Sequence, residues 1–160
     1  MLSLLRFAYG DNLSNFGLIK FMNTMSHLNT KKKLQRLIQQ GDVEEFCKYT
    51  NDVVECVNYE MKNEEEDNYL ICDIILYEDH TVAKRLFEAF RWICRLETQY
   101  HWSEVMRTMG HYAMLAAVTS KNTDILEHVM CHVDEELLYD RLLDEPDDHP
   151  ANIWYDKNFS

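Results

Sequence analysis

Apolar residues recur every three or four positions along much of the chain, which is the spacing that places side chains on one face of an α-helix. The longest run has apolar residues at Val82, Leu86, Phe87, Phe90, Ile93 and Leu96. It predicts an amphipathic helix over 82–96. We expect Thr81 to be its N-cap, because a threonine hydroxyl can accept a hydrogen bond from a free amide of the first turn.

The same spacing predicts three pairs of helices, each joined by a polar turn. The paired segments are 34–40 with 46–57, 69–75 with 82–96, and 105–118 with 125–130. Their turns are Gly41-Asp42, Glu78-Asp79-His80 and Lys121-Asn122-Thr123. The chain has only 4 glycines and 2 prolines, which favours long uninterrupted helices. The expected fold class is therefore all-α.

With 160 residues, the chain is long enough for one domain with its own core. Residues 1–29 are of mixed character and are interrupted by Gly10 and Gly17, so we interpret them as an N-terminal cap or arm. Residues 30–160 form the expected single helical domain. Near 62–68 an acidic run without an apolar face predicts an exposed linker inside that domain.

The segment from Gly110 to Met130 resembles one ankyrin repeat. Gly110 matches the first glycine of the ankyrin pattern, and residues 116–118 match its small inner-helix positions. The four apolar outer-helix positions are taken by Ile125, Leu126, Val129 and Met130. Segments 34–49 and 70–87 fit the same register, with turn positions 37 and 43 residues apart instead of about 33. This resemblance implies stacked helix-turn-helix repeats with insertions.

Such an array is similar in size to the small viral ankyrin proteins that imitate the inhibitor of NF-κB. Two segments, 34–46 and 82–96, also resemble amphipathic helices of small poxvirus proteins with a Bcl-2-like bundle. Both resemblances imply a viral protein for immune evasion. It would sequester or block a host signalling protein, in the NF-κB pathway, or bind an amphipathic helix to inhibit apoptosis or innate signalling. A stack and a bundle remain alternatives.

The net charge of the chain indicates which classes of partner it can bind. The formal net charge of −12 and the pI of about 4.9 disfavour direct binding to nucleic acids or anionic membranes. They also leave a third alternative, an acidic mimic of nucleic acid that blocks a DNA- or RNA-binding enzyme. The one basic cluster, Lys31-Lys32-Lys33, is expected to be a solvated helix start.

The five cysteines are odd in number and form no CxxC pair, which favours a reducing compartment, cytoplasmic or nuclear. No apolar run approaches the roughly 20 residues of a membrane span, so we expect no membrane association. His128 and His132 lie four residues apart and are candidate metal ligands, but no third ligand completes a motif. The sequence predicts no cofactor and no enzyme.

Five aromatic residues lie around the junction of the second and third helix pairs. They are Phe87, Trp92, Tyr100, Trp102 and Tyr112. Aromatic side chains dominate both cores and binding hot spots, so this cluster belongs either to the core, which is the more frequent case, or to a partner-binding site. The expected function is a non-enzymatic protein-protein interaction module. The sequence names neither its partner nor its oligomeric state.

Overall fold

The computed structural model describes residues 15–63 and 68–159, and within these ranges it contains helices and no strand. This confirms the all-α class. The helices are α2 (Asn15–Gln40), α3 (Val43–Lys48), α4 (Thr50–Lys62), α5 (Leu70–Ile75), α6 (His80–Glu97), α7 (Trp102–Ser120), α8 (Thr123–Val129), α9 (Glu135–Leu142) and α10 (Pro150–Phe159). No helix in the described ranges combines the length and hydrophobicity that a bilayer span needs.

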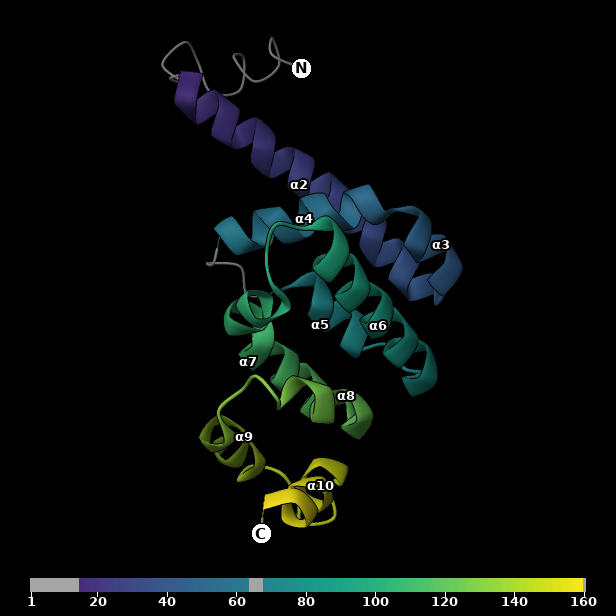
Figure 1. Cartoon of the computed structure of the whole chain (residues 1–160), viewed down its shortest axis with the longest axis vertical. Coiled ribbons are helices and arrows are strands. Elements are labelled where there is room, and N and C mark those ends of the chain that lie inside the picture. The colour runs from purple at the N-terminus through teal and green to yellow at the C-terminus, as the bar shows by residue number, and fades with distance from the viewer. Residues whose placement is uncertain (1–14, 64–67, 160) are drawn as a thin grey trace.

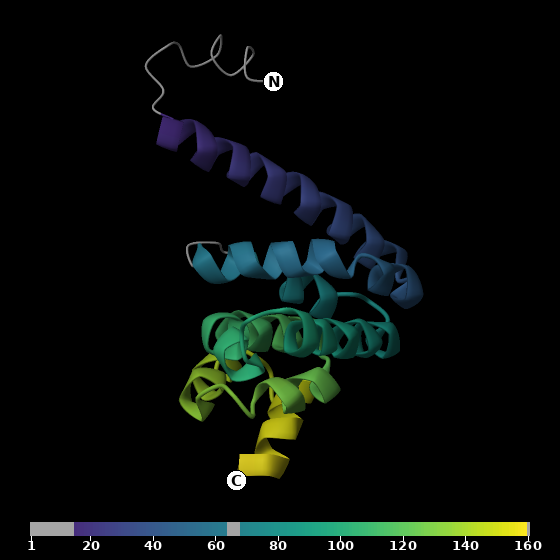
Figure 2. The same cartoon turned by 45° about the horizontal axis from the view of Figure 1, so that its top comes forward.

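The helices pack in two rows. One row consists of α2, α5, α7 and α9, each in contact with the next. The other row begins with α3 and α4, which both contact α6, and continues through α8 to α10. Figure 1 shows the result, with α2 at one end of the molecule and α10 at the other. Turned by 45°, the helices lie in successive layers (Figure 2).

Two of the predicted turns share one local structure. Gly41 and Lys121 both adopt left-handed backbone, with φ of 66° and 60°. The next residue is in each case the N-cap of the following helix: Asp42 accepts from the Glu45 amide at 3.1 Å, and Asn122 accepts from the Ile125 amide at 3.2 Å. A left-handed residue followed by an Asx cap ends one helix and starts the next within two residues.

The turn before α6 corrects the expected N-cap. Helix α6 begins at His80, and its N-cap is Asp79 instead of Thr81. One carboxylate oxygen of Asp79 accepts from the amides of Thr81 and Val82, at 3.0 and 3.2 Å. An aspartate in this position satisfies two amides that helix geometry leaves without partners, so it starts the helix earlier. All three turns thus end in an Asx N-cap.

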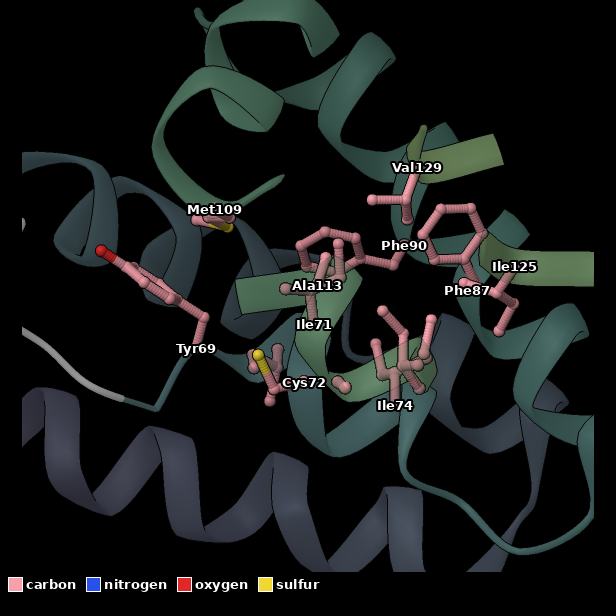
Figure 3. Close-up of a cluster of buried hydrophobic side chains, with 14 of the residues drawn as sticks. Tyr69, Ile71, Cys72, Ile74, Phe87, Phe90, Met109, Ala113, Ile125 and Val129 are labelled. Carbon is pink, nitrogen blue, oxygen red and sulfur yellow. The ribbon is translucent and has the colours of Figure 1, made fainter. Parts of the chain in front are cut away.

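A continuous hydrophobic core joins both rows. Figure 3 shows its centre, where Ile71 and Ile74 of α5 lie near Phe87 and Phe90 of α6. Residues of α7 and α8, including Met109, Ala113, Ile125 and Val129, pack on the same cluster. Each fully buried side chain of this size stabilises the fold by about 1.5–3 kcal/mol. Of the apolar positions predicted for 82–96, Leu86, Phe87, Phe90 and Ile93 are buried, whereas Leu96 is 59% exposed. The predicted positions Ile125, Leu126 and Val129 of α8 are all buried.

At the N-terminal side, α2 runs from Asn15 to Gln40 and passes through Gly17 without a break. The boundary expected between an arm (1–29) and the domain (30–160) lies inside this helix, and residues 1–14 lie outside the described residues. Helix α4 continues to Lys62, so part of the expected linker near 62–68 is helical. Residues 64–67 of that linker also lie outside the described residues.

The lysine cluster does not form a solvated helix start. It lies in the middle of α2, where Lys31 is buried and Lys32 and Lys33 are exposed. The Lys31 ammonium lies 3.4 Å from Glu60 of α4 and also donates to the carbonyl of Asn68. The fully buried Glu60 accepts from the amide of Leu70, at 2.9 Å, where α5 begins. This network connects α2, α4 and α5.

Candidate functional site

The predicted aromatic site separates into buried and exposed members. Phe87 and Trp102 are buried, and their rings meet edge to face with centroids 5.9 Å apart. Phe90 adds a second such contact to Trp102 at 6.2 Å. On the solvent side, the Arg91 guanidinium lies 5.8 Å from the Trp102 ring. Phe87 and Trp102 therefore join α6 to α7 and present no surface to a partner.

Two further members lie at the edge of the core. Tyr100 is partly buried and packs against the core cluster from the segment between α6 and α7. The Tyr112 ring lies 5.4 Å from the buried ring of Tyr69 and is 36% exposed. Both rings use most of their apolar area inside the protein, so they offer only an edge to the outside.

Trp92 is the most exposed of the five. Its side chain is 61% exposed, and Leu96, one turn further along α6, is 59% exposed. Arg85 and Glu88 are exposed on the preceding turns of the same helix side. Because residues three and four apart on a helix are neighbours, these four form one surface strip. We call Arg85, Glu88, Trp92 and Leu96 the Trp92 face.

Sequence reasoning missed Leu96 as a surface residue, because it fits an apolar period of three from Phe90 and Ile93. The angular positions of these residues around the helix predict the exposure of Leu96. At about 100° per residue, Trp92 and Leu96 lie roughly opposite the position of Phe90. The structure agrees, with Phe90 fully buried and Trp92 and Leu96 on the outer side.

The two candidate metal-binding histidines do not share a helix face. Helix α8 ends at Val129, and Met130 is its C-cap, so His132 lies beyond the helix. His128 instead lies with its ring 6.3 Å from that of Phe87. Among the residues that the structure describes, no group of three or more histidine, cysteine, aspartate or glutamate side chains could hold a metal ion.

Three of the cysteines lie in surroundings that disfavour the thiolate form. Cys56, Cys72 and Cys94 are buried free thiols, whereas Cys47 and Cys131 are exposed. Burial raises the pKa of Cys72 to about 11 and also raises the pKa of Cys94. Desolvation likewise raises the pKa of Cys47. A thiol with a raised pKa is protonated near neutral pH and is a poor nucleophile or metal ligand.

Two open clefts lie beside α2. One, of about 460 Å³, separates the first half of α2 from α4, and its lining includes Phe16, Lys20 and Tyr59. Inside it, the rings of His27 and Tyr59 stack with centroids 3.8 Å apart. The second, of about 600 Å³, lies between the end of α2 and the α5–α6 turn.

In the described residues, paired helices in two rows enclose a continuous core and leave Trp92 and Leu96 exposed on α6. The model of a "Family of unknown function (DUF5903)" matches residues 33–155, and the chain belongs to this family. The match begins within α2 and ends within α10, so it spans both rows. Searches of curated proteins and of solved structures find no match.

Proposed function

We propose that this protein is a non-enzymatic protein-binding module, that its helix pairs stack in an ankyrin-like array, and that it binds its partner through the Trp92 face. The two rows support the stacked arrangement, because each row advances by one helix per pair along the chain. A Bcl-2-like bundle would enclose its central helix, whereas α6 exposes a full side to solvent. This contrast favours the stack over the bundle.

The observation that carries the proposal is the exposure of Trp92 and Leu96 side by side on one rigid helix. Docking can cover roughly 150–250 Å² of a tryptophan, so covering the exposed part of Trp92 (61%) would contribute about 3 kcal/mol. Tryptophan is also among the residues most enriched in binding hot spots. Because folding does not bury this apolar area, a partner can bury it on binding.

The surroundings of the Trp92 face indicate the chemistry of the partner. Arg85 precedes Trp92 on the same strip, and Arg95 is exposed beside Leu96. Glu88 on the same strip adds a negative charge, so a partner with an apolar pocket and a rim of both acidic and basic groups would match this face. The resemblances to ankyrin and Bcl-2-like proteins imply a signalling protein that the module sequesters or blocks, and we propose a partner of that class.

Affinity capture with quantitative mass spectrometry tests the binding face directly. Trp92→Ala should lower the affinity for the captured partner about 30-fold, which corresponds to about 2 kcal/mol. Leu96→Ala should cause a smaller loss. Leu76→Ala is the matched control, because Leu76 is an exposed leucine (45%) at the end of α5, outside the face. It should capture the partner like the wild type.

Equal capture by the wild type and Trp92→Ala, with both proteins equally helical by circular dichroism, would show that binding does not use this face.

The salt dependence of the interaction tests the acidic-mimic alternative. Apolar docking persists at high ionic strength, whereas a contact made mainly by charges is screened there. Loss of the partner in high salt would therefore favour the mimic.

A further inference from the structure

The two ends of the helix stack carry opposite charges. Helix α2, at one end, has five basic side chains and no acidic one, although the whole chain has a net charge of −12. Residues 134–159, at the other end, have nine acidic side chains and two basic ones. In Figure 1 these segments lie at opposite ends of the molecule. Lys31 and Lys33 are paired with Glu60 and Asp52 of α4, so the contrast between the two ends rests on Lys20, Lys32 and Arg36 of α2.

The outer side of α2 combines this basic charge with exposed apolar side chains. The side facing the protein carries His27, Lys31 and Leu34, which are all buried. The remaining helix surface exposes Met22 (39%), Met25 (40%) and Leu28 (42%). Lys32 and Arg36 are exposed further along the same helix. We call Met22, Met25, Leu28, Lys32 and Arg36 the α2 end face.

The opposite end has the complementary composition. Helix α9, which contacts α7, buries Leu138 and Leu142, and its other side exposes Glu136 and Asp140. Leu143 and Asp144 follow directly after the helix and are also exposed, Leu143 by 65%. We call Glu136, Asp140, Leu143 and Asp144 the C-terminal end face. It offers an apolar anchor beside acidic side chains.

Because helical arrays bury each unit against its neighbours, an end unit with exposed apolar residues has an incomplete contact. We propose that the α2 end face of one copy docks on the C-terminal end face of a second copy. Opposite charges flank the apolar anchors on the two faces, so they attract each other, whereas two copies of either face would repel. The contact is head to tail, which leaves one free face at each end and permits longer chains.

Such a contact is small, and we expect weak, concentration-dependent association in the roughly micromolar range. Salt should weaken it, since the Debye length falls to about 3 Å at 1 M ionic strength. The Trp92 face lies on α6, in neither end face. Trp92→Ala should therefore self-associate like the wild type, and this keeps a failure of the proposed partner-binding face separate from a failure of the head-to-tail contact.

Complementary variants test the head-to-tail geometry. Met25→Glu removes the α2 end face and Leu143→Lys removes the C-terminal end face, and both positions are exposed, so the fold should be kept. By sedimentation velocity over a concentration series, each variant alone should remain a monomer. Their equimolar mixture should form a dimer and stop there, because one intact face of each kind remains.

Charge reversal provides a second test that leaves the apolar anchors intact. Lys32→Glu with Arg36→Glu should weaken association at least tenfold, and so should Asp140→Lys with Asp144→Lys. The protein carrying all four substitutions should associate again, because both ends are reversed together. A wild type that stays monomeric throughout the series, or association that only Met25→Glu abolishes, would overturn the proposal. The second result would indicate a symmetric contact between α2 helices.

Discussion

The two sides of α6 lie in different surroundings. One side places Phe87 and Phe90 in the core against Trp102, and the other places Trp92 and Leu96 in solvent. Both sides contain aromatic and aliphatic residues, but the outer side also carries the charged Arg85 and Glu88. If the outer side is the binding face that we propose, stability and binding can be changed separately on this helix, and the substitutions below test this.

The largest expected effect is on the buried side. Phe87→Ala removes a ring that is 1% exposed and contacts both Trp102 and His128. The cavity and the lost apolar burial should lower the free energy of unfolding by about 4 kcal/mol. Urea denaturation followed by circular dichroism measures this change. A loss below about 1 kcal/mol would mean that the interface between α6 and α7 is not packed as described.

Breaking a buried ion pair should lower the free energy of unfolding more than breaking an exposed one. Glu60→Gln should cost about 3 kcal/mol, because it leaves the buried Lys31 ammonium without its carboxylate at the contact between α2 and α4. Lys33→Ala is the matched control, since Lys33 forms a solvent-exposed pair with Asp52 at 2.9 Å. An exposed pair of this kind contributes less than about 1 kcal/mol. Equal effects in urea denaturation would contradict the burial of the network.

Substitutions at the two left-handed turn residues should change the stability by smaller amounts and in opposite directions. Gly41→Ala should destabilise the protein by about 2 kcal/mol, because alanine is disfavoured at φ of 66° and its Cβ would overlap the Tyr77 ring. Lys121→Gly should stabilise it by roughly 0.5 kcal/mol, because glycine adopts left-handed backbone freely. Thermal melts of both variants measure the difference, and a stabilising Gly41→Ala would contradict the turn geometry.

Much of the fold follows from local patterns in the sequence. Helical spacing identified the apolar positions of α6 and α8, and polar residues identified the turns at Gly41, Glu78 and Lys121. These features depend on neighbours within a few residues. The early start of α6 was missed because Asp79, two residues before Thr81, accepts from the amides of Thr81 and Val82 and so brings Thr81 itself into the first turn.

The candidate site depended more on tertiary structure. Within α6, the helical wheel separates Trp92 from Phe87, whereas the burial of Trp102 follows from the packing of α6 on α7. The burial of Lys31 was hidden in the sequence, because its partner Glu60 lies on another helix. Contacts between residues distant in sequence decide these two outcomes. The misplacement of His132 has a local cause, because α8 ends three residues earlier, at Val129.

The most direct test of the central claim measures stability and binding together for Trp92→Ala. Because Trp92 is 61% exposed, its replacement should change the free energy of unfolding by no more than about 0.5 kcal/mol while partner affinity falls about 30-fold. Urea denaturation and quantitative affinity capture on one protein preparation provide both values. Unchanged affinity, or a loss of stability comparable to that of Phe87→Ala, would contradict the division of α6 into a core side and a binding side.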